Sequence, residues 1–465
     1  ARKRREKVTG KVITLDRALE DALTYLFGLL STVEDDDALA QMDAQVRRRR
    51  TLEAIKRILL RESLNQPLMV IFEDLHWIDE QTQEFLNLLA DSIGTAKILL
   101  LVNYRPEYSH RWNSKTYYTQ LRLDPLGQES ASEMLTSLLG DGDDLAALKR
   151  VIIDRTEGTP FFMEETVQVL LDDGALVRNG TVRLARPLAA LKIPTTVQAI
   201  LASRIDRLPP DAKDLLQTLA VLGREFPTSL IRAVRTKSDD ELNRTLNDLQ
   251  VGEFIYEQPA VGDVEYTFKH ALTQEVAYNS VLLERRKVLH EWAGEGIEAL
   301  FAGQLEDRLG ELAHHYSHSP NIGKAVKYLQ LAGQQAAQRS AYAEAVGYLT
   351  NGLELVKSLP DEPQRAGQEL ELLLPLAESL RWTKGYGSAE TGRALVRARE
   401  ICTLMGKTTE LFAVLQHLQG HHQIRLDLDT ARDLGEQLLT LAESTGESAK
   451  LMVAHAGLGL VFLLR

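Results

Sequence analysis

The sequence predicts an α/β region with a small parallel sheet, followed by a winged helix and a long all-α region. Two apolar runs, Leu68–Phe72 and Ile98–Val102, enclose a segment with helical spacing, which is the pattern of a β-α-β unit. Helices followed by a β-prone hairpin candidate at Glu253–Phe268 suggest the winged helix. From His270 onward the chain has helical periodicity with only short breaks.

Composition narrows the class of protein. The 465 residues, 44% hydrophobic and 26% charged, suggest a soluble protein of two to four domains. The net charge of -12 argues against binding to nucleic-acid phosphates. The single cysteine, Cys402, excludes an intramolecular disulfide and fits a reducing compartment. No apolar run is long enough to span a bilayer, and the basic N-terminus lacks the hydrophobic segment of a secretory signal, so we expect a cytoplasmic protein.

Both ends of the sequence look truncated. The sequence lacks an initiator Met, and its last residues, VFLLR, stop inside an apolar helical pattern. We therefore expect a fragment of a longer polypeptide.

The elements follow in order along the chain. Residues 1–66 have helical patterns with charge-rich breaks at Glu34–Asp37 and Arg47–Arg50. The Arg run is either a phosphate-binding patch or, as we favour, a solvated helix face. The two apolar runs lack the alternation of half-exposed strands, so we expect strands covered on both faces. Residues 130–176 are helical with breaks at GDGDD and EGTP, and Ile193–Val234 holds helices separated by Pro209-Pro210.

Small and large apolar residues recur at spacings of four and three in the last third of the chain. Such spacing places them where neighbouring helices pack closely, which favours helical-hairpin repeats over the alternative of one irregular helical domain. The positions are Ala325, Leu329, Ala332, Ala345, Leu349 and Gly352, with a looser echo at Ala431, Gly435 and Leu438.

Carboxylates follow the first apolar run directly. Ligands of open α/β sheets lie beyond the carboxyl ends of the strands, and Glu73 and Asp74 occupy that edge. Two acids there can hold a hydrated Mg²⁺ together with phosphate oxygens. Asp79 could orient an attacking water, or it could simply cap the helix that begins near Glu80. The alternative for the whole cluster is a set of solvated loop carboxylates.

The second apolar run is followed by a cation, Arg105, in place of an acid. A carboxylate pair beside a guanidinium suits a metal-bound phosphate, because the acids hold the metal and Arg105 contacts the terminal phosphate. The alternative is that Arg105 only neutralises Glu73 or Asp74.

Several segments together carry a family resemblance. FEDLHWID followed by LLLVNYRPEY resembles Walker B and sensor strands, and TEGTPFFMEE resembles a Gly-x-Pro motif that opens a helical lid. We find a resemblance to the two ends of a winged helix in IPTTVQAILASRIDRLPPDAKDLLQTLAVLGREF and YTFKHALTQEVAYNSVLLERRKVLH. The segment that leads into tetratricopeptide-like (TPR-like) repeats is resembled by LAHHYSHSPNIGKAVKYLQLAG. As a set, over residues 40–360, they resemble the STAND subgroup of AAA-like ATPases, in the form found beside bacterial adenylate/guanylate cyclase domains, protein kinases and LuxR-type regulators.

The resemblance implies the roles of the polar residues at the strand ends. Asp74 and Glu73 would hold Mg²⁺, with either of them as the primary ligand, and Arg105 would be the sensor arginine. The family often has Thr or Ser just before that arginine, whereas this chain has Asn103-Tyr104, which puts a hydroxyl contact in doubt.

The resemblance also implies a nucleotide contact from the lid and the winged helix. Gly158 and Pro160 would border the adenine of ATP, with the proline ring packed on the base. His270 would touch the nucleotide diphosphate, and the alternative is a histidine that is packed in the core or at an interface.

One expected motif is absent from the sequence. The loop Gly-x-x-x-x-Gly-Lys-Ser/Thr supplies backbone N–H groups and a lysine to the phosphates. The nearest match, Gly406-Lys407-Thr408, has Ile401 in place of the first glycine and lies in the repeat region. In the family the loop precedes the Walker B strand, so we expect the cut at Ala1 to have removed it and the fragment alone to bind ATP poorly or not at all.

The resemblance implies an ATP-dependent signalling switch that hydrolyses ATP in the full-length protein. Its repeats would bind a protein or small-molecule inducer, its effector (a cyclase, kinase or transcription domain) would lie in the same polypeptide, and nucleotide could drive oligomer formation. The alternative is a non-catalytic helical-repeat scaffold with a vestigial ATPase core. The implied domains are a partial AAA-like core lacking the P-loop at 1–127, a helical lid at 128–190, a winged-helix-like domain at 191–270, a helical connector at 271–322 and TPR-like repeats at 323–465.

For two further sequence patterns we favour a structural interpretation over a functional one. The helices of the winged helix are not rich in Lys or Arg, so we favour intramolecular packing over DNA reading. His314 and His318 stand four apart beside Glu311 and His315, a spacing that suits zinc. We favour ordinary packing of the helix that leads into the repeats.

Overall fold

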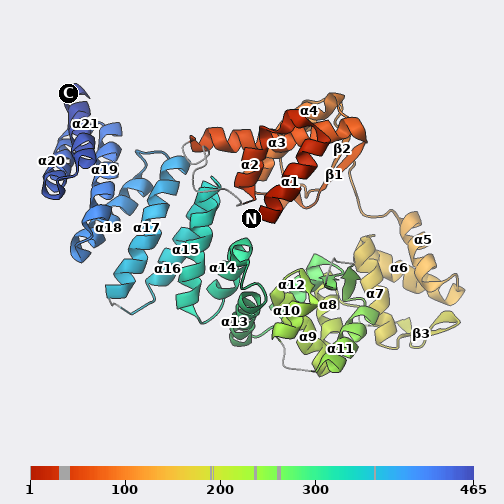
Figure 1. Ribbon diagram of the computed structural model, residues 1–465. Coiled ribbons are helices and arrows are strands. Elements are labelled where there is room, and N and C mark those ends of the chain that lie inside the picture. The colour runs from red at the N-terminus through yellow and green to blue at the C-terminus, as the bar shows by residue number, and fades with distance from the viewer. Residues whose placement is uncertain are drawn as a thin grey trace. The chain divides into compact units, whose positions relative to one another are not determined.

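The computed structural model divides the chain into two compact units, one of Ala1–Leu121 with Leu329–Arg465 and one of Arg122–Tyr328. The finer division into five domains stays a prediction. Among the described residues, no helix is long and apolar enough to cross a membrane. The structure describes residues 2–30, 42–188, 191, 193–234, 238–258, 263–360 and 363–464 (Figure 1).

The first part of the chain contains the predicted β-α-β unit. Strands β1 and β2 pair in parallel, with Leu68 opposite Ile98 and Phe72 opposite Val102. The elements are α1 (Arg2–Leu15), α2 (Ala22–Leu29), α3 (Ala44–Asn65), β1 (Leu68–Phe72), α4 (Glu80–Ser92) and β2 (Ile98–Val102). Short 3₁₀ turns lie at Arg17–Leu19, Leu75–Trp77, Ile93–Thr95 and Trp112–Ser114. The predicted break at Arg47–Arg50 is wrong, because α3 runs through it, and the predicted break at Glu34–Asp37 lies outside the described residues.

Described residues cover only one face of the β1–β2 pair. Phe72 and Leu100 pack against Leu52 of α3 and Leu89 of α4. The prediction of strands covered on both faces is therefore wrong for the described chain. An apolar run records the residue types on both faces of a strand, but it does not record whether a layer lies over each. The uncovered face carries Met69, Ile71, Leu99 and Leu101, which are 63%, 53%, 55% and 48% exposed.

The second unit begins with three helices and a hairpin. Helices α5 (Gln128–Leu139), α6 (Ala146–Thr156) and α7 (Pro160–Asp172) confirm the predicted helical stretch and its two breaks. They share a core in which Leu135, Leu148 and Met163 are fully buried. A 3₁₀ turn lies at Asp143–Leu145, and the hairpin strands are β3 (Leu176–Asn179) and β4 (Thr181–Leu184). The sequence analysis did not predict this hairpin.

The next elements confirm helices followed by a hairpin. The antiparallel sheet has the order β5-β7-β6, and residues 259–262 of the predicted hairpin lie outside the described residues. Pro210 stands in the first turn of α9 and Gly223 is its C-cap, the expected punctuation of a helix. The elements are α8 (Val197–Asp206), α9 (Pro210–Leu222), β5 (Glu225–Pro227), α10 (Thr228–Val234), α11 (Asp239–Val251), β6 (Ile255–Gln258) and β7 (Glu265–Phe268).

A buried ion pair joins α7 to α8. The side chains of Arg204 and Glu165 are 3% and 4% exposed, and Nη1 lies 2.5 Å from Oε2. The same guanidinium donates to the carbonyl of Gly252 at 2.6 Å and lies 4.7 Å from the ring centroid of Phe254. One side chain thus connects α7 to α8 and to the turn after α11.

The rest of the chain is helical, as predicted. From α16 onward each helix packs against the next, and Figure 1 shows them as a stack. The small residues allow this close packing: a Cβ at Gly352 would lie 2.9 Å from Leu372, and one at Gly435 would lie 2.5 Å from Gln419. Cys402 is fully buried in α18. The elements are α12 (Ala271–Asn279), α13 (Leu283–Leu300), a 3₁₀ turn (Leu305–Arg308), α14 (Leu309–Ser317), α15 (Ile322–Gln338), α16 (Tyr342–Val356), α17 (Pro363–Thr383), α18 (Ala389–Met405), α19 (Thr408–Ile424), α20 (Leu428–Thr445) and α21 (Ser448–Leu464).

Candidate functional site

The carboxyl ends of β1 and β2 lie side by side. The backbone N–H of Asn103, just after β2, donates to the carbonyl of Phe72 at 3.2 Å. Two further bonds join the segments that follow: Asn103 Oδ1 accepts from the N–H of Asp74 at 2.7 Å, and its carbonyl accepts from the N–H of Leu75 at 3.0 Å. Glu73 and Asp74 therefore share a sheet edge with the segment that leads to Arg105.

Asp74 has a strained backbone, with φ 56° and ψ 45° in the left-handed region. A non-glycine residue there costs of the order of 1–3 kcal/mol, and such residues cluster at functional sites. The bonds to Asn103 hold this conformation, in which Glu73 is exposed and Asp74 is half-buried. Sequence reasoning noted Asn103 only as a replacement for a hydroxyl residue, because its bond across to the other strand end is visible only in the fold.

Arg105 lies over an aromatic ring. Its exposed guanidinium is 5.6 Å from the ring centroid of Trp77, in the 3₁₀ turn that follows the acids. This cation–π contact orients the guanidinium without enclosing it. The neighbouring His76, to which the sequence gave no role, has both ring nitrogens buried without a hydrogen-bond partner among the described residues.

Asp79 caps α4. Its Oδ1 accepts from the backbone N–H groups of Gln81 and Thr82 at 2.9 Å each, and its Oδ2 accepts from the Thr82 hydroxyl at 2.6 Å. Burial acts to raise the pKa of Asp79, but these hydrogen bonds outweigh it and hold the pKa below its ordinary value. Both oxygens are engaged, so of the two roles considered for Asp79 the structure supports the cap.

The surroundings of Gly158 in the second unit leave no room for a side chain at this position. Its φ of +74° is a conformation that favours glycine, and a Cβ there would lie 2.1 Å from the carbonyl oxygen of Leu126. The two residues also pair, since the N–H of Leu126 donates to the carbonyl of Gly158 at 2.9 Å. Pro160 follows as the exposed first residue of α7, where its missing N–H costs nothing.

His270 is the N-cap residue of α12 and packs beside the start of α7. Its ring centroid is 3.9 Å from that of Phe161, the residue after Pro160. Its Nε2 is buried with no hydrogen-bond partner in the part of the chain that the structure describes. Burial, assisted by Lys269 and Arg224, lowers the pKa of His270, so the ring is neutral at pH 7.

The predicted residues thus form two groups. Glu73, Asp74 and Arg105 belong to the first unit, and Gly158, Pro160 and His270 to the second. The first group fits Mg²⁺, which prefers one or two carboxylates with phosphate oxygens and water. In the second group, Nε2 of His270 can donate to a phosphate oxygen when it carries the ring proton.

The chain has distant likenesses among known proteins. No family model matches the chain. An uncharacterized protein of Rhizobium meliloti (strain 1021) is 29% identical over 402 residues, which cover 83% of this chain and 37% of that protein. The crystal structure of a Signal Transduction ATPase with Numerous Domains (STAND) protein with a tetratricopeptide repeat sensor, from Pyrococcus horikoshii, aligns with a TM-score of 0.36 and 12% identity over 95% of this chain and 72% of that chain. This structural likeness is too distant to assign a function.

Proposed function

We propose that this chain is part of an ATP-dependent signalling switch of the STAND type. The observation that carries the proposal is the pair of strand ends that brings Glu73 and Asp74 to one sheet edge with the segment before Arg105. Bound Mg²⁺ would neutralise the charge of the phosphates there. Glu73 and Asp74 hold the metal, and Arg105 contacts the terminal phosphate.

The second unit has candidate nucleotide contacts of its own. Pro160 and His270, which come together through Phe161, contact the base and the diphosphate. The ion pair of Arg204 and Glu165 ties the lid helix α7 to the winged helix, so the two respond to the nucleotide as one body.

The repeats act as the sensor of the switch. A hollow of about 590 Å³ lies along α18 and α19, and Arg393 and Arg425 among its lining residues suit an anionic inducer, either a small molecule or a protein segment. The chain covers 37% of the length of the curated relative that it matches. In our proposal the effector domain belongs to the same polypeptide, which is cytoplasmic and oligomerises in response to nucleotide.

The test uses a version of the protein extended upstream to include a phosphate-binding loop. We expect it to bind and hydrolyse Mg-ATP, and the double variant Glu73→Gln/Asp74→Asn to lose turnover. Asp79→Asn is the matched control, because Asp79 caps α4 and should leave turnover intact. Unchanged hydrolysis in the double variant would refute the assignment of the acids.

The second candidate function is a non-catalytic helical scaffold. It is favoured by the absence of the phosphate-binding loop from the sequence and by the large helical fraction. The two candidates separate on the residues encoded upstream of Ala1: a strand followed by Gly-x-x-x-x-Gly-Lys-Ser/Thr supports the switch, and a sequence without it supports the scaffold.

A further inference from the structure

Three histidines converge between α13 and α14 in the second unit. His290 of α13, His314 of α14 and His318 at the end of α14 each offer one ring nitrogen, and these three nitrogens lie within 4.8 Å of one another. His290 is fully buried, whereas His314 and His318 are exposed. We propose that these three imidazoles form a binding site for a divalent transition metal, with Zn²⁺ as the preferred ion.

His318 is held in the tautomer that a metal ligand needs. Its Nδ1 lies 2.8 Å from the carbonyl oxygen of His314. A carbonyl can only accept, so Nδ1 carries the proton and the lone pair of Nε2 is available. Binding through Nε2 would leave this hydrogen bond in place.

His290 has partners that suit a ligand in the protein interior. Its Nδ1 lies 3.0 Å from Nδ1 of His315, and its Nε2 lies 3.1 Å from the hydroxyl of Tyr278. Whichever nitrogen binds the metal, the other keeps a hydrogen-bond partner, as metal-ligating histidines almost always do.

The distances between the three ring nitrogens need only a small decrease to match those of a zinc site. Bonds of 2.0–2.1 Å place the nitrogens of a tetrahedral zinc site about 3.4 Å apart. The rings of His314 and His318 lie at exposed positions, where they can close the difference without moving the core.

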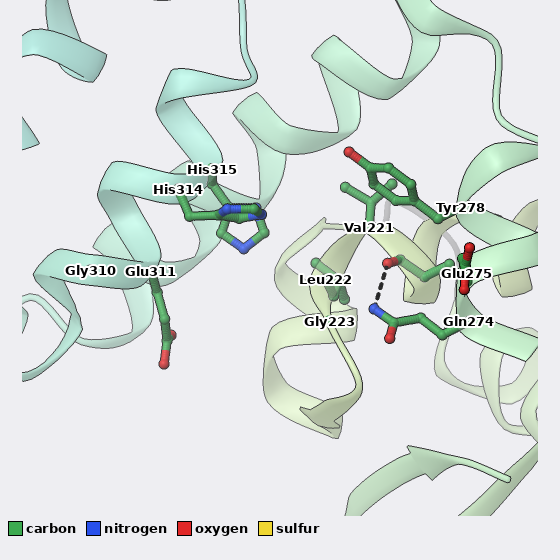
Figure 2. A pocket seen from close by; sticks show the side chains of 11 residues that line it. Val221, Leu222, Gly223, Gln274, Glu275, Tyr278, Gly310, Glu311, His314 and His315 are labelled. Carbon is green, nitrogen blue, oxygen red and sulfur yellow. Dashed lines mark hydrogen bonds between the residues drawn. The ribbon is translucent and has the colours of Figure 1, made fainter. Parts of the chain in front are cut away.

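The fourth coordination position is left to water or to an added ligand. Figure 2 shows His314 and His315 facing the hollow that Leu222 and Tyr278 also line, with the Glu311 side chain directed away from the imidazoles. The hollow measures about 590 Å³, and His314 is the proposed ligand that lines it. Three protein ligands and one open position are the composition of a reactive or regulatory zinc site, in contrast to the closed four-ligand structural site.

The experiment titrates the full chain, stripped of metal with a chelator, with Zn²⁺ and with Co²⁺. We expect one equivalent to bind, the Co²⁺ form to show visible absorption bands of low coordination number, and Zn²⁺ to raise the unfolding midpoint. Single variants His314→Gln and His318→Gln should weaken binding by at least the roughly 10–100-fold that follows loss of an outer-shell partner.

The controls separate this site from adventitious binding. His455→Gln, at an exposed histidine of α21, should leave affinity and midpoint shift unchanged. Circular dichroism of the metal-free His314→Gln/His318→Gln variant should match the parent chain. The proposal is overturned if the parent chain binds no metal at micromolar concentration, or if that double variant binds it as tightly as the parent does.

Discussion

Arg204 offers the sharpest test of how the second unit is held together. Arg204→Ala would remove a guanidinium that contacts the carboxylate of Glu165 at 2.5 Å and the carbonyl of Gly252 at 2.6 Å. The Glu165 side chain is 4% exposed, so it would stay buried without its counter-charge. Removal of one partner of such a pair costs about 3–5 kcal/mol. We expect the variant to lose that much stability locally, in α7, α8 and the turn after α11.

Hydrogen exchange is the suitable assay, because a chain of two units need not unfold in one step. Amides of α7 and α8 should lose protection in Arg204→Ala, while those of α16–α21 should not. The matched control is Arg285→Ala, which breaks the half-exposed pair with Asp214 and should cost at most about 1 kcal/mol. If Arg204→Ala loses no more protection than Arg285→Ala, the ion pair does not hold α7 to α8.

Three smaller predictions follow from the sites described. Gly158→Ala should destabilise its unit more than Gly140→Ala, by thermal unfolding, because both have positive φ but only at Gly158 would a Cβ meet a backbone carbonyl, at 2.1 Å. Asn103→Ala should cost about 0.5–1.5 kcal/mol and raise hydrogen exchange at Asp74; an unchanged exchange rate at Asp74 would contradict the role given to the amide. Asp79→Ala should cost about 0.5–2 kcal/mol at pH 7. Because the folded pKa of Asp79 is lowered, its contribution is present above the unfolded value of about 3.9 and is lost as pH falls through the folded pKa, so urea melts of parent and variant should converge at low pH.

Sequence patterns predicted the structural features that depend on residues close together in the chain. The paired strands, the breaks before α7 and α9 and the buried face of the repeats follow from apolar runs, proline and small residues, which act on their own segment. The strand-end acids were found for the same reason, since they follow a strand directly.

What the sequence missed depends on partners far along the chain. Asn103 acquires its importance from a bond to a residue 29 positions away, and His290 joins His314 and His318 only because α13 packs on α14. The uncovered face of β1 and β2 was missed because composition does not reveal which layers are present. Six roles, those of Glu73, Asp74, Arg105, Gly158, Pro160 and His270, stay predictions.

The buried Cys402 has a practical consequence. It is the only cysteine in the chain, it is fully buried, and burial raises the pKa of its thiol, so maleimide dyes will react slowly with it. Cysteines introduced on the surface of each unit can therefore be labelled selectively with a fluorophore pair. Energy transfer between the dyes would then report, in single molecules and in real time, whether an added nucleotide or inducer changes the separation of the two units.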